Sequence, residues 1–251
     1  MEFLQKAVKG HEIWILPETR HSHRGQEVHC RVFYGHAMHP DGLAELGRLK
    51  GWAVDPGGDR MQLPVLEGRG EYRIARLVPE REGLWAITAE NDVGPFVLTK
   101  GGLYKPGTRK NHPEAREAAY YYQFAKTYLQ VGRFCPACGD LSKQADVSFL
   151  GNDLEIIVLP GDYRLGSEVE IQVRYRGGPL PQTLVCATWN GSPKRDWVLR
   201  VVTDSAGIAR INLSERGDWL FYVRHADETR GVPEEYDRRI LSATMTLHGI
   251  Q

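Results

Sequence analysis

Short segments in which apolar and polar residues alternate are the feature that most limits the folds open to this chain. Residues 28–34 place Val28, Cys30, Val32 and Tyr34 on one side of the segment. Because successive side chains of a β-strand point to opposite faces, this pattern predicts a half-buried strand. The same reasoning predicts strands at residues 71–77, 84–90, 169–175, 198–203, 208–213, 219–223 and 242–248.

Turn-forming residues separate these segments. Gly177-Gly178-Pro179 follows one predicted strand, and residues 204–207 and 214–218 are rich in Asp, Ser and Gly. Strands spaced roughly eight to twelve residues apart are typical of β-sandwiches. The sequence therefore predicts a mainly β protein with two Ig-like β-sandwich units.

One segment between the two units has helical spacing. Asn111 is a favourable cap, Pro113 suits a first turn, and Gly132 suits a helix end. Between them one helical face carries Ala118, Tyr122, Ala125 and Leu129. We therefore expect one connecting helix. The expected organisation is an amino-terminal domain over residues 1–110, a connector over 111–150 and a carboxy-terminal domain over 151–251.

Composition and motifs exclude several functional classes. Lys plus Arg equals Asp plus Glu, at 32 each in 251 residues, so the chain has no net field that would recruit nucleic acid. A Gly-x-Ser-x-Gly elbow, His-Glu-x-x-His, a P-loop and Gly-x-Gly-x-x-Gly are all missing from the sequence. We therefore predict a non-enzymatic protein that does not bind nucleic acid.

Histidines are concentrated near the amino terminus, where six of the nine lie between residues 11 and 39. Neutral imidazole is a common ligand for nickel, cobalt, copper and zinc. His36 and His39 follow a predicted strand, where loops often display ligands. His21 and His23 would share one side of a strand, or would lie in an exposed turn.

Two further features leave alternatives open. Cys135 and Cys138 form one Cys-x-x-Cys, which suits half of a zinc site or a local disulfide. The residues Val8-Lys9-Gly10 suit signal-peptidase cleavage just before His11, although no apolar leader segment precedes them. A free amine at His11 would chelate a metal together with its own imidazole.

Several motifs, in order along the chain, resemble extracytoplasmic proteins encoded beside nickel and cobalt uptake systems of the energy-coupling-factor type. The opening His11-Glu12-Ile13-Trp14-Ile15-Leu16-Pro17 is similar to the start of those mature proteins. The loop Tyr34-Gly35-His36-Ala37-Met38-His39-Pro40 is similar to their Gly-His loop. Later matches are Gly83-Leu84-Trp85-Ala86, Thr99-Lys100-Gly101-Gly102, Gly177-Gly178-Pro179-Leu180 and Gly217-Asp218-Trp219-Leu220.

This resemblance implies a periplasmic protein that binds Ni²⁺ or Co²⁺ and passes it to the membrane subunits of a transporter. Zn²⁺ and Cu²⁺ are alternatives for the same nitrogen ligands. The expected metal ligands are His36 and His39, then His11, with His21 and His23 as further candidates. Because a ligating imidazole must be neutral, binding is expected to weaken as the pH falls through about 6.5.

The alternative is a module that binds no metal. Tandem β-sandwiches also serve as interaction or carbohydrate-binding modules, because a fold does not fix a function. In that case the histidines are incidental, and exposed aromatic residues such as Trp14, Trp52 or Trp189 would form the binding platform.

Overall fold

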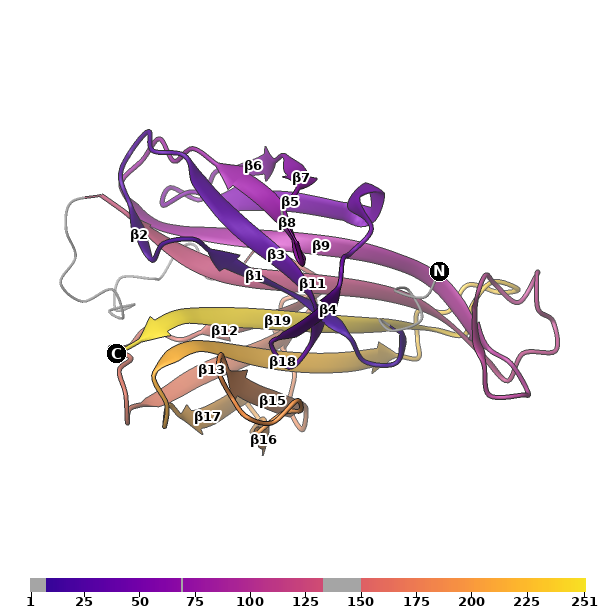
Figure 1. The fold of residues 1–251 in the computed structure, drawn as a ribbon. Helices are drawn as coiled ribbons and strands as arrows, with labels where there is room; N and C mark the ends of the chain where they lie inside the picture. The colour runs from indigo at the N-terminus through magenta and orange to yellow at the C-terminus, as the bar shows by residue number, and fades with distance from the viewer. Residues whose placement is uncertain (1–7, 69, 133–149) are drawn as a thin grey trace.

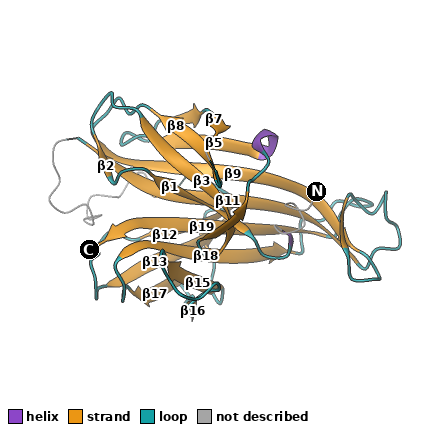
Figure 2. Cartoon of the chain, viewed as in Figure 1, coloured by secondary structure: helices purple, strands orange, loops and turns teal. Residues whose placement is uncertain are grey.

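The computed structural model describes residues 8–68, 70–132 and 150–251, and these consist almost entirely of strands and loops (Figure 1, Figure 2). The prediction of a mainly β fold is therefore confirmed. Beside the strands there is a short 3-10 helix, η1 (Leu46–Arg48). Within the described ranges, no helix has the length and apolar character needed to cross a membrane.

The first sheet is built from strands of the amino-terminal half. Its order is β1-β3-β8-β7, and β4 forms a hairpin with the end of β3. The strands are β1 (Glu12–Pro17), β3 (Val28–His36), β4 (His39–Gly42), β7 (Val65–Glu67) and β8 (Tyr72–Leu77).

The central sheet has ten strands and is shared by both halves of the chain. Its main order is β16-β15-β18-β19-β11-β9-β5-β6, with β10 on β9 and β2 on β11. The halves join where β11 and β19 run parallel. The strands are β2 (His21–Ser22), β5 (Leu49–Val54), β6 (Arg60–Leu63), β9 (Gly83–Leu98), β10 (Tyr104–Pro106), β11 (Glu117–Val131), β15 (Leu184–Trp189), β16 (Leu199–Val202), β18 (Gly217–Asp227) and β19 (Arg238–Ile250).

The third sheet belongs to the carboxy-terminal half. In it β13 pairs with β12, β14 and β17. The strands are β12 (Leu154–Val158), β13 (Glu168–Tyr175), β14 (Gly178–Pro179) and β17 (Ile208–Asn212). Because one continuous sheet serves both halves, the prediction of two separate Ig-like units is not confirmed.

The two large apolar cores lie on opposite faces of β11. Tyr121, Ala125 and Leu129 point into the core beneath the first sheet, whereas Phe124 and Tyr128 point into the core beneath the third sheet. Since alternate residues of a strand face opposite ways, this one strand contributes to both cores. The first and third sheets therefore cover opposite faces of the central sheet, above and below it in Figure 1.

A smaller apolar cluster ties the halves together. Trp14 and Met38 of the amino-terminal half pack with Trp197, Leu220 and Tyr222 of the carboxy-terminal half. Beside this cluster, the Thr244 hydroxyl of β19 donates a hydrogen bond to the Ile13 carbonyl of β1 at 2.7 Å. The start of β1 and the β3–β4 hairpin thus lie against β18 and β19.

The predicted connecting helix is wrong, because residues 117–131 form strand β11. This strand lies between β9 and β19 and is buried on both faces, so its apolar residues run almost without interruption and lose the alternation of a half-buried strand. The aromatic run Tyr120-Tyr121-Tyr122 favours a strand. Cys135 and Cys138, in the remainder of the predicted connector, lie outside the described residues.

Candidate functional site

The β3–β4 hairpin presents two histidines on neighbouring strands. His36 pairs with His39 across a two-residue turn formed by Ala37 and Met38, whose φ angles are +48° and +64°. Positive φ at both central residues is the type I′ geometry that matches the twist of a hairpin. Gly35 is required beside it, because a Cβ there would lie 2.1 Å from the His39 carbonyl oxygen.

The turn is held although neither central residue is Gly, Asn or Asp. Ala37 is fully buried, Met38 is 9% exposed, and both pack in the small interhalf cluster. The Ala37 N–H also donates to Glu12 Oε1 at 2.6 Å. A strained left-handed backbone persists only where its surroundings fix it, and such positions concentrate at functional sites. The packing and this hydrogen bond therefore fix where His36 and His39 stand.

Glu12 is the buried partner of His36. Its side chain is 1% exposed, and Oε2 lies 3.4 Å from His36 Nδ1. Burial raises the pKa of the Glu12 carboxyl to about 7. Hydrogen bonding to Glu12 is in turn the main cause that raises the pKa of His36 to about 9, against the opposing effect of its own burial. The pair therefore holds a positive charge on the imidazole near neutral pH.

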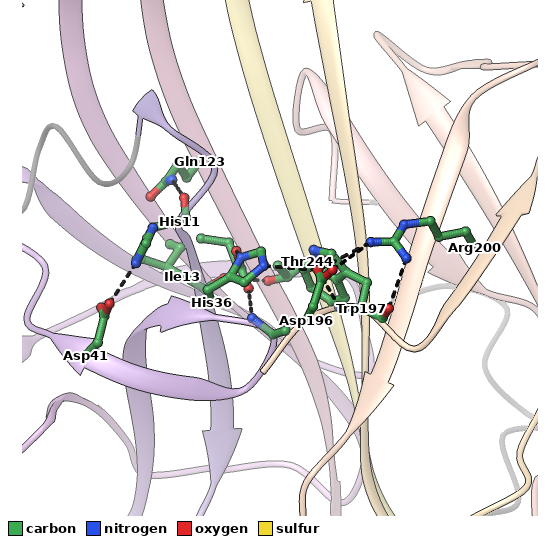
Figure 3. Close-up of polar contacts among 11 residues, drawn as sticks. His11, Ile13, His36, Asp41, Gln123, Asp196, Trp197, Arg200 and Thr244 are labelled. Atoms are coloured by element: carbon green, nitrogen blue, oxygen red, sulfur yellow. Dashed lines mark hydrogen bonds and ion pairs between the residues drawn. The ribbon is translucent and has the colours of Figure 1, made fainter. Parts of the chain in front are cut away.

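Asp196 faces the other nitrogen of His36, as Figure 3 shows. Its Oδ1 lies 3.4 Å from His36 Nε2, and its carboxylate also pairs with Arg200 at 3.1 Å. The Trp197 backbone N–H, which donates to Asp196 at 2.7 Å, is the main cause that lowers the pKa of this carboxyl. The Trp197 ring stands edge-on to the His36 ring, with centroids 5.6 Å apart. His36 thus bridges carboxylates from both halves of the chain.

His11 and His39 complete the surroundings of His36. His11 Nε2 lies 2.8 Å from Asp41 Oδ2, and its ring centroid is 5.9 Å from that of His36 (Figure 3). The Gln123 side chain fixes the backbone here by donating to the His11 carbonyl at 2.6 Å. His39 Nε2 donates to the Lys194 carbonyl at 3.1 Å, in the same loop that carries Asp196.

The sequence-predicted histidines therefore fall into two groups. His11, His36 and His39 come together, whereas His21 and His23 lie at β2 beside the far end of β11, with ring centroids 5.3 Å apart. In the ranges that the structure covers, no three His, Cys, Asp or Glu side chains already form a metal-binding group. Metal ligation at the first group requires side-chain rotation.

The methionine of the hairpin turn and the three tryptophans suggested as a binding platform all pack against other side chains. Met38 is packed in the interhalf cluster, so its thioether is not available at the surface. Trp14 is 1% exposed and stacks on Phe33, which removes it from any exposed aromatic platform. Trp189 packs on Trp219, and Trp52 is covered by the Arg60 guanidinium.

Sequence reasoning missed Glu12 and Asp196. Asp196 lies 160 residues from His36, and its neighbours Lys194 and Arg195 form an ordinary polar loop, so nothing in the pattern marks it. Glu12 did carry a signal, because it is a lone carboxylate at the start of the otherwise apolar segment Ile13-Trp14-Ile15-Leu16. A charged residue in such a strand is buried only when it has a partner.

Together these features define a class: a mainly β, sandwich-type protein with a histidine held between carboxylates at the junction of its two halves. The chain belongs to the DUF4198 family, described as a domain of unknown function, whose model matches residues 8–227. No curated protein matches the chain.

Solved structures show only distant likeness. Salmonella alpha-2-macroglobulin reacted with methylamine is 12% identical, with a TM-score of 0.27, over 95% of this chain and 15% of that one. A DUF4785 family protein from Legionella pneumophila is 7% identical, with a TM-score of 0.31, over 84% of this chain and 50% of that one. The D0-D1 domain of intimin is 10% identical, with a TM-score of 0.23.

Proposed function

We propose that this protein binds a divalent transition metal, Ni²⁺ or Co²⁺, at His36. The observation that carries the proposal is the buried Glu12 carboxylate behind His36 Nδ1, at 3.4 Å, which leaves Nε2 facing Asp196 in the half-exposed junction. Metal-ligating histidines almost always present their second nitrogen to a carboxylate or carbonyl in this way, because it fixes the ring and strengthens the ligand.

The first two ligands are His36 Nε2 and an Asp196 carboxylate oxygen. Two atoms that each lie about 2.1 Å from a tetrahedral ion such as Zn²⁺ are about 3.4 Å apart, and two adjacent ligands of a square-planar or octahedral ion are about 3.0 Å apart. The observed separation of these two atoms is 3.4 Å. An ion on the open side of this edge would replace the direct contact between them without moving either backbone.

His11 and His39 supply further nitrogen ligands after rotation about their side-chain bonds. To bind the ion, His39 gives up its hydrogen bond to the Lys194 carbonyl, and His11 gives up its contact with the Asp41 carboxylate. The Lys194 carbonyl and the Asp41 carboxylate can then bond to water, so losing these two contacts costs little free energy. An ion held by a partly preformed shell is also released readily, as delivery of a metal requires.

A metal must displace the proton of His36. Because the pKa of His36 is raised to about 9, affinity rises with pH up to about 9 and falls below it. This moves the expected pH dependence upward from the value near 6.5 that an ordinary histidine predicts. Glu12 and Asp196 stabilise the protonated imidazole of His36, and they would stabilise a bound metal ion for the same electrostatic reason.

The chemistry of the ligands does not choose among Ni²⁺, Co²⁺, Zn²⁺ and Cu²⁺, since imidazole suits all four. The preference for nickel or cobalt, the extracytoplasmic location and the transfer to membrane transporter subunits rest on the sequence resemblance. If cleavage before His11 frees its amine, the amine and the imidazole chelate the ion together, next to His36.

The test is calorimetric titration of metal-stripped protein with Ni²⁺, Co²⁺, Cu²⁺ and Zn²⁺, using chains that begin at Met1 and at His11. We expect a Kd of about 1 μM or tighter for the preferred ion, which corresponds to about −8 kcal/mol. His36→Ala is expected to weaken binding at least about tenfold, the effect of losing roughly 1.4 kcal/mol.

His29→Ala is the matched control, because His29 Nε2 also lies near a carboxylate, Glu27, at 2.9 Å, but is remote from the junction. It is expected to leave the affinity unchanged. Equal losses in the two variants, or no binding of any ion by either form of the wild-type chain, would overturn the proposal.

A further inference from the structure

One face of the central sheet is hollowed at a place away from His36. A cavity of about 330 Å³ opens there, with its floor on β9, β11 and β19. Cross-strand pairing fixes the floor, because Tyr122 lies beside Leu241 and Tyr120 lies beside Arg239. The rim consists of Arg60 on one side and residues 151–153 on the other. This volume is at the lower end of the range for small-molecule pockets.

The cavity exists because the third sheet covers only part of this face of β11. At Lys126 the face is closed by β12, where Lys126 Nζ pairs with Glu155 at 2.7 Å. Phe124, Tyr122 and Tyr120 continue the same face beyond β12 and form an aromatic floor. Figure 1 shows β9, β11 and β19 running side by side past the end of the third sheet.

Most charged groups of the cavity already have partners. Glu90 pairs with Arg60 at 3.0 Å and accepts the Tyr122 hydroxyl at 2.8 Å, and Asp153 pairs with Arg230 at 2.9 Å. Tyr120 donates its hydroxyl to Asp92 at 2.7 Å. These contacts hold the hydroxyl groups of the two tyrosines, so the floor is already formed without a ligand.

Arg239 is the exception. Among the described residues no ion pair joins its guanidinium to a carboxylate, and its Nε is buried without a hydrogen bond. The guanidinium carbon lies 5.7 Å from the centre of the Tyr120 ring, and one guanidinium nitrogen donates to the Tyr236 hydroxyl at 3.4 Å. A guanidinium presents several donors in a plane that matches a carboxylate. A cation without a carboxylate partner, next to an aromatic floor, suits an anionic ligand.

We infer that this cavity binds a small organic carboxylate, whose acid group pairs with Arg239 and whose body packs on Tyr120, Tyr122 and Phe124. The buried Asn152 side chain at the rim adds an amide that can bond a hydroxyl or carbonyl of the ligand. Two kinds of carboxylate suit this floor. In one the acid group is attached to a planar aromatic ring, and in the other it is attached to a sugar whose apolar face packs on the floor.

The test uses benzoate and glucuronate as probes, with benzamide and glucose as their neutral counterparts, titrated into the full chain and followed by NMR. A carboxylate is expected to bind and to shift the side-chain amide of Asn152, but not that of Gln172 on β13. The neutral counterparts are expected to bind at least about tenfold more weakly, because a charge-assisted hydrogen bond is lost. Binding by benzoate alone identifies an aromatic ligand, and binding by glucuronate alone identifies an acidic sugar.

Arg239→Gln is expected to lower the carboxylate affinity about tenfold or more and to leave any binding of the neutral probes unchanged. Arg210→Gln is the matched control, because Arg210 is an exposed strand arginine paired with Glu170 at 2.8 Å. If Arg239→Gln does not fold, the Asn152 shift and the preference of the wild type for charged probes still decide. The inference is overturned if neither carboxylate binds, if neutral probes bind equally well, or if Arg239→Gln retains the full affinity.

Discussion

Two carboxylates, Glu12 and Glu155, are buried where the halves of the molecule meet, and they hold their cations in different ways. Glu155 of β12 is 1% exposed and pairs with Lys126 of β11, which is itself 3% exposed. Glu155 also accepts the Leu150 backbone N–H at 2.9 Å. Burial lowers the pKa of Lys126, because it disfavours the charged ammonium. This junction is closed to solvent, and its two charged groups form an ion pair with each other.

Glu12 is equally buried, but its partner reaches solvent. The His36 side chain is 34% exposed, and its far nitrogen faces Asp196, which is 59% exposed. The imidazole of His36 can lose its proton to solvent, and a metal ion can then take the place of that proton. The ammonium of Lys126 is sealed in the core, so no other cation can reach Glu155. The buried pair of Lys126 and Glu155 therefore serves to join the halves. The partly exposed pair of His36 and Glu12 can also exchange a proton for a metal ion.

The largest effect is expected from breaking the closed junction. Lys126→Met leaves Glu155 buried without its cation, which costs about 3–5 kcal/mol of unfolding free energy. Chemical denaturation measures the loss. The double change Lys126→Met with Glu155→Leu is the control, and it is expected to recover most of the stability because no uncompensated charge remains. A loss under about 1 kcal/mol in the single variant would contradict the closed-junction interpretation.

The next effect concerns the hairpin that places His36. Gly35→Ala drives a methyl group into the His39 carbonyl and is expected to cost about 3 kcal/mol, the upper end for overpacking. Gly47→Ala is a matched control, since a Cβ at Gly47 would meet nothing within 4 Å. Thermal unfolding of the two variants should therefore differ clearly. Equal melting temperatures would show that the turn does not need glycine.

The role of Glu12 in the open junction is tested by removing its charge. In Glu12→Gln the pKa of His36 is expected to fall from about 9 toward the ordinary value of 6.5, because the carboxylate was the main cause of the rise. NMR titration of the His36 ring proton measures this, with His29 as a reference in the same spectra. A His36 pKa that stays near 9 would place the cause outside Glu12.

The same pair sets a pH dependence of stability. Both folded pKa values are raised, that of Glu12 from 4.5 to about 7 and that of His36 from 6.5 to about 9. The folded chain therefore binds more protons than the unfolded chain across this window. The contribution of His36 is fully present below about 6.5 and is lost as the pH rises through about 9. Urea unfolding at several pH values should show this decline in the wild type, and a smaller one in Glu12→Gln.

The smallest effect is expected away from both junctions. His21→Ala with His23→Ala removes two predicted ligands that lie at β2, at the far end of β11. Metal affinity is expected to stay within a factor of about two of the wild type, since neither ring reaches His36. A large loss in calorimetric titration would show that the ion sits at β2 and would move the proposed site there.

The strands that alternate were predictable. Residues 169–175 and 208–213 are half-buried, and they appear as β13 and β17 with one face in the core. Strand β11 was not predictable in this way, because both of its faces are buried and the apolar pattern then carries no period of two. The shared central sheet was missed for the same reason, since β11 is its joining strand.

The candidate site was predictable only in its local part. His36 and His39 flank a turn in the sequence, so their proximity is a property of a few residues. Asp196 reaches them through tertiary packing, which a single sequence does not encode as a pattern. His21 and His23 lie apart from His36, at β2, because histidine density alone does not say which strand each residue joins.

The parallel pairing of β11 with β19 has a consequence for how the protein is made. During synthesis β11 leaves the ribosome long before β19, and until then one edge of a strand of fifteen residues has no neighbour. An unpaired, apolar strand edge is a template for wrong pairing with other chains. The nascent amino-terminal half is therefore open to wrong pairing until β19 has been made, and slowing translation before β19 should increase its aggregation.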